Sequence, residues 1–178
     1  MRFAAFLRGV NVGGNKKIDM ATLRHVLEDA GMTRVATVLQ SGNAVFDYDG
    51  SEPAALATRI EAAIEAGFGF SPTVLLRSLR ELERAIAADP LGEVATDPAR
   101  HLLGFLRDPP TKASILAAES ESTGDDLVRI IGSHLYMWCP HGISRSPLFK
   151  VDFGRLLGTP VTMRNRNTVA RVVDRLRS

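Results

Sequence analysis

The sequence predicts a mixed α+β protein made of two tandem ferredoxin-like, or split βαβ, plaits with an extra C-terminal helix. Three observations lead to this fold class. The order strand–helix–strand–strand–helix–strand can be read twice along the 178 residues. A segment with two Asp-Pro pairs, residues 89–98, separates the two readings and is typical of a linker loop. One more amphipathic helix follows the second reading.

The first half contains four predicted strands, which are Arg2–Leu7, Val35–Leu39, Ala44–Tyr48 and Thr73–Leu76. Its first helix is expected to begin after Asp19, a favourable N-cap, and to end at Gly31. Pro53 marks the start of its second helix, because proline suits the first helical position. A connecting helix over residues 77–88 completes a first subdomain of residues 1–88.

The second half, residues 99–178, repeats this order of elements. Its predicted strands are His101–Leu106, Leu127–Ile131, Leu135–Cys139 and Pro160–Met163. Its predicted helices are Lys112–Ala118, Leu148–Leu157 and a last helix whose apolar face runs from Val169 to Leu176. Asn167 or Thr168 is expected to cap that last helix. This assignment leaves Arg164 and Asn165 without a structural role.

The composition is that of an ordinary globular protein, with 45% hydrophobic and 24% charged residues. No apolar run approaches the ~20 residues of a membrane span, and the apolar start is too short for a secretory signal. The only cysteine, Cys139, excludes an internal disulfide. These features favour a bacterial-type cytoplasmic protein that does not associate with a membrane. The oligomeric state is left open.

The net charge of +2 is unevenly distributed along the chain. Residues 47–126 hold 15 acidic and 7 basic side chains, whereas residues 144–178 hold 8 basic and 2 acidic ones. Residues 1–46 hold 6 basic and 3 acidic side chains, so both ends are positive. Clustered cations attract anionic ligands, although a solvated basic helix at the C-terminus would give the same count.

Three polar strings, Arg8–Lys17, Gln40–Asn43 and Thr162–Thr168, each adjoin a predicted strand and are rich in Gly, Asn or cations. Glycines permit positive φ angles and let backbone N–H groups face a ligand. The first string precedes a helix N-terminus, which favours negative charge. It differs from a phosphate-binding P-loop, because Asn15 stands where that motif has lysine. We therefore exclude a P-loop nucleoside triphosphatase.

The predicted topology places these strings in pairs. The first strand of a split βαβ plait pairs with the third, so the end of strand one lies beside the turn between strands two and three. We expect Asn11 or Asn15 within hydrogen-bonding reach of Gln40–Asn43. By the same reasoning, His141–Ser146 should lie beside Arg164–Thr168. We also expect Arg164 and Asn165 to reach toward the same cleft as the first pair, because ligand sites often form where two such halves join.

The candidate ligand-binding residues share polarity or backbone freedom within these strings. They are Arg8, Asn11, Gly13, Gly14, Lys16, Lys17, Gln40, Ser41, Asn43, Ser144, Ser146, Arg164 and Asn165. No catalytic nucleophile or base is identified, and no cofactor is expected. The pair Cys139 and His141 lacks further ligands, so no metal site is expected.

The strings resemble those of the bacterial domain of unknown function 1697 family. The resemblance rests on Leu7–Gly14, Gln40–Asn43, Pro140–Ser146 and Thr162–Thr168 and spans nearly the whole chain. It implies two ferredoxin-like subdomains and no assigned activity. The family usually has Lys where this chain has Pro147 and Trp where it has Arg166, so a ligand contact made by either residue would be altered here.

The leading functional hypothesis is a protein that binds a small anionic ligand or a nucleic-acid phosphate through these loops. One alternative is an enzyme that acts on a phosphorylated or nucleotide metabolite, with charge stabilisation and an unidentified acid or base. Another is a protein-interaction module that uses an exposed sheet or edge strand.

Overall fold

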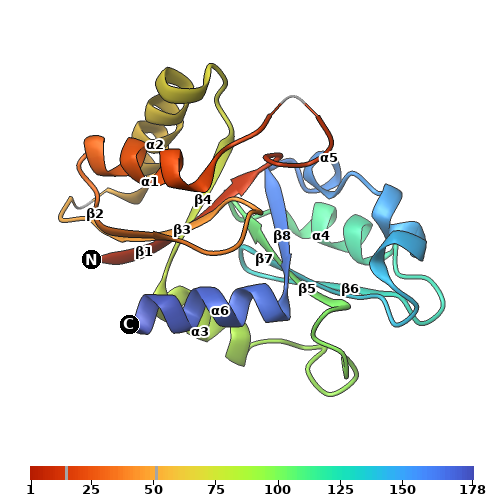
Figure 1. Cartoon of the computed structure of the whole chain (residues 1–178). Helices are drawn as coiled ribbons and strands as arrows, with labels where there is room; N and C mark the ends of the chain where they lie inside the picture. Colours follow the sequence, from red (N-terminus) through yellow and green to blue (C-terminus); the bar gives the residue numbers. More distant parts are fainter. Residues whose placement is uncertain (15, 51) are drawn as a thin grey trace. The chain divides into compact units, whose positions relative to one another are not determined.

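The computed structural model describes residues 1–14, 16–50 and 52–178 (Figure 1). It is a mixed α+β protein, and its described residues form two four-stranded antiparallel sheets and six α-helices. The strands are β1 (Arg2–Arg8), β2 (Thr33–Thr37), β3 (Asn43–Asp47), β4 (Thr73–Ser78), β5 (His101–Leu106), β6 (Leu127–Ile131), β7 (His134–Trp138) and β8 (Val161–Asn165). The α-helices are α1 (Met20–Asp29), α2 (Pro53–Phe68), α3 (Leu79–Ala87), α4 (Lys112–Glu119), α5 (Phe153–Leu157) and α6 (Arg166–Arg177). Two short 3₁₀ helices are η1 (Ile143–Arg145) and η2 (Pro147–Lys150).

The chain divides into two compact units. The first unit comprises residues 1–83 and 170–178, and the second comprises residues 84–169. Residues 170–178 are tied to the first unit by hydrogen bonds from Arg2 to the Arg175 carbonyl (3.0 Å) and from Arg34 to the Ser178 carbonyl (3.3 Å). The expected division into subdomains 1–88 and 99–178 around a linker at 89–98 stays a prediction.

Both sheets have the strand adjacency that the sequence predicts. The order is β2-β3-β1-β4 in the first sheet and β6-β7-β5-β8 in the second. Phe3 therefore faces Phe46 across β1 and β3, and Leu103 faces Tyr136 across β5 and β7. The first and third strands of each half are adjacent and antiparallel. This confirms the predicted strand pairing, which places the polar strings beside one another.

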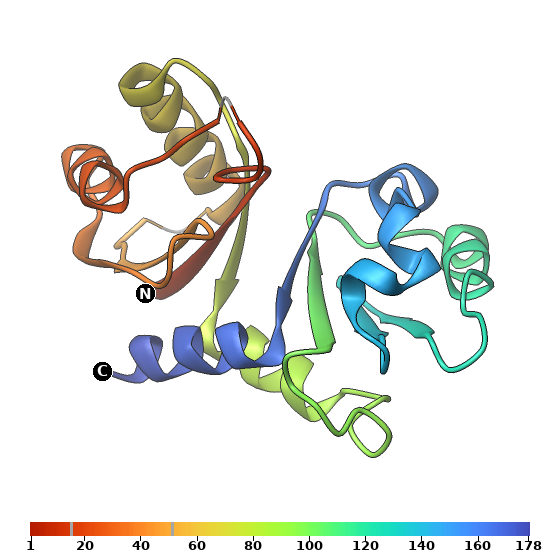
Figure 2. The same cartoon turned by 45° about the vertical axis from the view of Figure 1, so that its right-hand side comes forward.

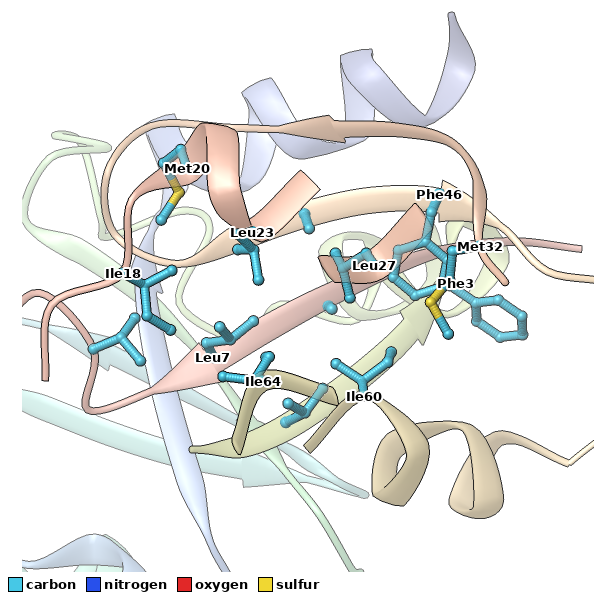
Figure 3. Packing of buried hydrophobic residues seen from close by; sticks show 14 of the residues in the cluster. Phe3, Leu7, Ile18, Met20, Leu23, Leu27, Met32, Phe46, Ile60 and Ile64 are labelled. Carbon is cyan, nitrogen blue, oxygen red and sulfur yellow. The ribbon is translucent and has the colours of Figure 1, made fainter. Parts of the chain in front are cut away.

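In the first unit, α1 and α2 cover one face of the sheet (Figure 1). Asp19 caps α1 as predicted, since its Oδ2 accepts a hydrogen bond of 2.7 Å from the Thr22 N–H. Leu23 and Leu27 of α1 and Ile60 of α2 are fully buried against Leu7 of β1 (Figure 3). Burial of each such side chain contributes about 1.5–3 kcal/mol to folding, so this core holds the end of β1 in place.

In the second unit, α4 and α5 cover one face of the other sheet (Figure 2). The prediction of a single helix over Leu148–Leu157 is wrong, because η2 and α5 are separate there. Val151 has extended backbone angles, which end η2, and the Asp152 Oδ1 accepts a hydrogen bond of 3.0 Å from the Arg155 N–H to cap α5. An aspartate inside a short apolar pattern thus starts a new helix, because its side chain competes for backbone N–H groups.

The prediction that Asn167 or Thr168 caps the last helix is also wrong. Asn165 precedes the first residue of α6, and its Oδ1 accepts a hydrogen bond of 2.9 Å from the Thr168 N–H. Asn165 therefore has a structural role as the N-cap of α6, whereas the sequence predicted none for it. The cap lies earlier in the chain than either predicted residue, because β8 leads directly into the helix.

We expect Asn165→Ala to destabilise the protein by about 1 kcal/mol, because it removes the side chain that caps α6. The matched control is Asn167→Ala, which alters an exposed residue of the same helix. Urea unfolding of both variants provides the measurement. An Asn167 variant that loses as much stability as the Asn165 variant would contradict this assignment of the cap.

Candidate functional site

The first two polar strings lie together in the first unit. The Asn11 Nδ2 donates a hydrogen bond of 2.6 Å to the Gln40 carbonyl, and the Leu7 N–H donates one of 2.8 Å to the Gly42 carbonyl. These contacts confirm the prediction that Arg8–Lys17 and Gln40–Asn43 share one edge of the sheet. Asn15, the other expected partner of the turn, lies outside the described residues.

Asn11 closes the loop of residues 8–17, which we call the glycine-rich loop. Its Oδ1 accepts a hydrogen bond of 2.8 Å from the Ile18 N–H, and its Nδ2 donates one of 3.0 Å to the Ile18 carbonyl. Its backbone N–H also donates to the Lys16 carbonyl at 2.9 Å. Asn11 has a φ of +54°, a left-handed conformation that asparagine adopts more readily than most residues. One side chain therefore joins both ends of the loop to the neighbouring hairpin.

Two apolar residues anchor this loop in the core. Val10 is 3% exposed and Ile18 is 2% exposed, and Ile18 lies in the cluster that also contains Leu7 (Figure 3). The described residues between them, 11–14 and 16–17, are all exposed. The glycine-rich loop is thus a solvent-facing tip on two buried anchors, which reduces the entropy that it would lose on binding a ligand.

The predicted glycine conformations are present in the loop. Gly13 and Gly14 have φ angles of +54° and +134°. Among the described residues other than their chain neighbours, no atom lies within 4 Å of the position that a Cβ would take on either glycine. They serve the backbone conformation and leave space above the loop. Gly42 differs, because a Cβ there would overlap the Val10 side chain and lie 3.1 Å from the Leu7 Cβ.

A pocket of about 390 Å³ adjoins the loop and is lined by Asn11, Gly14, Lys17, Ile18 and Asp19. The side chains of Arg8, Lys16 and Lys17 are exposed and form no ion pair with any of the residues that the structure describes. One short segment therefore combines a sheet edge, a pocket and three cations that have no ion-pair partner among the described residues.

Asp19 limits where an anion can bind. Hydrogen bonds from the Thr22 N–H and hydroxyl hold the pKa of the Asp19 carboxyl below its ordinary value. The carboxylate is therefore ionised at neutral pH and occupies the N-terminus of α1. The helix end is thus less favourable for a second negative charge than the sequence analysis assumed, and the loop cations become the better anion contacts.

The hairpin residues divide into two groups. Gln40 and Ser41 are exposed beside the loop. Asn43 is completely buried, and its Nδ2 donates hydrogen bonds of 2.9 Å to the Val38 carbonyl and to the Ser41 Oγ. The Asn43 side chain therefore stabilises the turn from inside and is not presented to solvent.

The candidate residues of the second half lie in the second unit, on segments that leave one edge of its sheet. Trp138, at the end of β7, and Asn165, at the end of β8, both lie opposite the start of β5. Ser144 is exposed on η1. Ser146 is 5% exposed, and its hydroxyl donates a hydrogen bond of 2.7 Å to Asp126 and accepts one of 3.1 Å from the Leu148 N–H. Ser146 thus caps η2 from a buried position.

Arg164 is also more enclosed than the sequence suggests. Its Nη1 donates hydrogen bonds to the Thr162 Oγ1 at 2.8 Å and to the Met163 carbonyl at 2.9 Å. Burial lowers the pKa of the Arg164 guanidinium to about 10, so the group remains charged at neutral pH. It is a cation partly covered by its own strand, unlike the exposed Arg8.

Sequence reasoning missed a buried charged cluster of Asp89, His101 and Arg166 in the second unit. His101 Nε2 lies 3.2 Å from Asp89 Oδ2, and Arg166 Nη1 lies 3.7 Å from the same oxygen. The only sequence signals are an aspartate before proline and a histidine at the start of a strand. Neither signal predicts that residues so far apart in the chain would meet.

No group of three or more His, Cys, Asp or Glu side chains suited to hold a metal ion occurs in residues 1–14, 16–50 and 52–178. Within the same residues, every helix is too short or too polar to cross a membrane.

Comparison with known proteins places the chain in a family. The profile of the family described as "Protein of unknown function (DUF1697)" matches residues 1–136, so the chain belongs to that family. Among solved structures, the chain is similar to conserved bacterial protein SP0830 from Streptococcus pneumoniae. The identity is 25%, the TM-score is 0.77, and the match covers 98% of each chain. No curated protein matches the chain.

Proposed function

We propose that the glycine-rich loop binds a phosphate-bearing anion, either a small metabolite or the phosphate backbone of a nucleic acid. The observation that carries this proposal is the combination of Arg8, Lys16 and Lys17. All three are exposed, lack an ion-pair partner among the described residues, and lie on a loop that Asn11 fixes beside a pocket.

The physical argument concerns preorganisation. A single exposed ion pair contributes only about 0–1 kcal/mol in water, so one cation cannot hold an anion well. Several cations on a fixed loop add their fields, and the chain loses little conformational entropy when the ligand arrives. The backbone N–H groups of Gly13 and Gly14 can add hydrogen bonds, because both residues are exposed.

We also propose the finer description of the fold, two tandem ferredoxin-like plaits, which the strand orders β2-β3-β1-β4 and β6-β7-β5-β8 support. A cytoplasmic location remains a proposal from the composition and the single Cys139.

The test is a titration with two probes at low salt: pyrophosphate, and a fluorescently labelled single-stranded oligonucleotide. We expect each of Arg8→Ala, Lys16→Ala and Lys17→Ala to weaken binding about 2–5-fold, and the triple variant to weaken it about 30-fold or more. These losses should shrink at high salt, because screening weakens exposed charge contacts. Binding of pyrophosphate alone would indicate a small ligand, and binding of the oligonucleotide would indicate a nucleic acid.

Lys112→Ala is the control, since Lys112 is an exposed lysine of the second unit, outside the loop. It should leave both affinities unchanged. A triple loop variant that binds both probes as tightly as the wild type would refute the proposal. Arg164→Ala in the same titration tests the expectation that Arg164 serves the same ligand as Arg8, which stays a prediction.

A further inference from the structure

The buried cluster of Asp89, His101 and Arg166 belongs to no part of the proposed ligand site. The side chains of Asp89 and His101 are each 5% exposed, and that of Arg166 is 21% exposed. The second carboxylate oxygen of Asp89, Oδ1, accepts a hydrogen bond of 2.9 Å from the Leu91 N–H. A carboxylate so deeply buried is costly unless its partners stay in place.

Arg166 contacts both ends of the segment 89–98. Its guanidinium lies 3.7 Å from Asp89, and its backbone N–H donates a hydrogen bond of 3.0 Å to the Pro98 carbonyl. Within the segment, the Val94 and Ala95 N–H groups donate to the Leu91 carbonyl, and Leu91 is 3% exposed. The segment is therefore a closed turn whose ends meet at one residue of α6.

The contacts within the cluster are electrostatic and are not well-aligned hydrogen bonds. Asp89 Oδ2, His101 Nε2 and Arg166 Nη1 are all buried, and none has a hydrogen-bond partner with good geometry among the described residues. Such a cluster depends on charge more than on directional bonding, so neutralising its one carboxylate removes most of the attraction.

The titratable and charged groups that face Asp89 come from three elements. They are His101 of β5, Arg166 of α6 and, at longer range, Tyr136 of β7. The Tyr136 hydroxyl donates a hydrogen bond of 2.8 Å to the Ala85 carbonyl, and burial raises its pKa to about 12, with a further contribution from the Asp89 charge. Tyr136 is therefore neutral in the range where a carboxylate titrates, so it does not change charge when Asp89 does.

We propose that Asp89, His101 and Arg166 form an acid-labile clamp that holds segment 89–98 closed and releases it when Asp89 is protonated. Protonation abolishes the attraction between Asp89 and Arg166 and leaves the buried Nη1 of Arg166 without its counter-charge. The hydrogen bond from Arg166 to Pro98 and the apolar contacts of Leu91 are then insufficient to keep the segment ordered.

The direction of the pH dependence follows from the surroundings of Asp89. Burial alone would raise the pKa of its carboxyl, but the polar contact with His101, the Leu91 N–H and the charges of His101 and Arg166 lower it below the ordinary 3.8. The folded pKa is thus below the unfolded one. The stabilisation is complete above the unfolded value and is lost as the pH falls through the folded value.

The test is amide hydrogen exchange of the full chain, with Asp89→Asn as the neutral form of the residue. At pH 7 we expect the Leu91, Val94 and Ala95 amides of this variant to exchange about tenfold faster than those of the wild type, or more. The difference in protection should disappear as the pH falls below the pKa of Asp89, because the wild type is then also neutral. Trp138, the only tryptophan, lies 6.5 Å from His101 between ring centroids and gives a parallel fluorescence signal.

Asp97→Asn is the matched control, since Asp97 lies in the same segment and pairs with Arg100 at the surface, at 3.2 Å. It should change protection by less than about twofold. If Asp89→Asn does not fold, Arg166→Gln keeps the backbone N–H and is assessed by the same criteria. The clamp would be overturned if, at pH 7, the amides of segment 89–98 in the tested variant exchanged within about twofold of the wild-type rates. Loss of protection in the segment and in β5 at the same pH would also overturn it, because the acid transition would then be global.

Discussion

Gly42→Ala should destabilise the protein by about 2–5 kcal/mol, the largest effect that we expect from any single methyl group in this chain. Gly42 has a φ of +75°, where an alanine costs about 1–2 kcal/mol. The new Cβ would also overlap the Val10 side chain and press on the Leu7 Cβ, and such overpacking adds about 1–3 kcal/mol. Both neighbours hold the glycine-rich loop against the sheet, so the strain would act directly on the candidate site.

Gly69→Ala is the control for backbone strain alone. Gly69 has nearly the same φ, +78°, and belongs to the same unit, but its Cβ position has no atom within 4 Å from the described residues beyond its chain neighbours. Urea unfolding should separate the two variants by about 1–3 kcal/mol. Equal losses of stability would mean that the overlap of the new Cβ with the Val10 side chain costs no stability.

Asn11→Ala should cost about 2–3 kcal/mol, because one side chain makes hydrogen bonds to the Ile18 N–H, the Ile18 carbonyl and the Gln40 carbonyl. Alanine also tolerates the φ of +54° less well than asparagine. We expect faster amide exchange at Ile18 together with a weaker affinity for pyrophosphate, since the cations would lose their common platform.

Gln40→Ala is the informative comparison for Asn11. Gln40 accepts the hydrogen bond from Asn11 through its backbone carbonyl, so removal of its side chain leaves the contact intact. Its stability should stay within about 0.5 kcal/mol of the wild type. If the Gln40 variant were as unstable as the Asn11 variant, the loop would depend on the glutamine side chain and not on the contact described here.

Much of the fold can be predicted from the sequence, because its elements have local causes. Asp19 begins α1 through its side chain, and Gly158 ends α5 through its left-handed backbone. Both preferences act within a few residues. The adjacency of β1 and β3 follows from the order of elements, and it correctly brings Asn11 to Gln40. The break at Asp152 was missed since an apolar pattern of helical spacing continues across it.

The roles of individual polar residues depend on tertiary contacts that no local pattern reveals. Asn43 looks like an exposed turn residue, yet its amide is buried inside the hairpin. Asn165 looks free, yet it caps α6. Asp89 and Arg166 are far apart in the sequence and meet because β8, which leads into α6, pairs with β5, and because the Arg166 N–H bonds to the Pro98 carbonyl. Sequence reasoning correctly placed the glycine-rich loop beside the Gln40–Asn43 turn, because each is a continuous segment at the end of a predicted strand.

The most direct test of the central claim is an NMR titration of isotope-labelled protein with pyrophosphate at low salt. We expect saturable shifts of the amide signals of residues 9–14 and 16–18, with smaller shifts at Gln40 and Ser41. These shifts should be lost in the triple variant of Arg8, Lys16 and Lys17. Shifts confined to other parts of the chain, or a wild-type response that the triple variant retains, would contradict the claim that this loop is the anion-binding site.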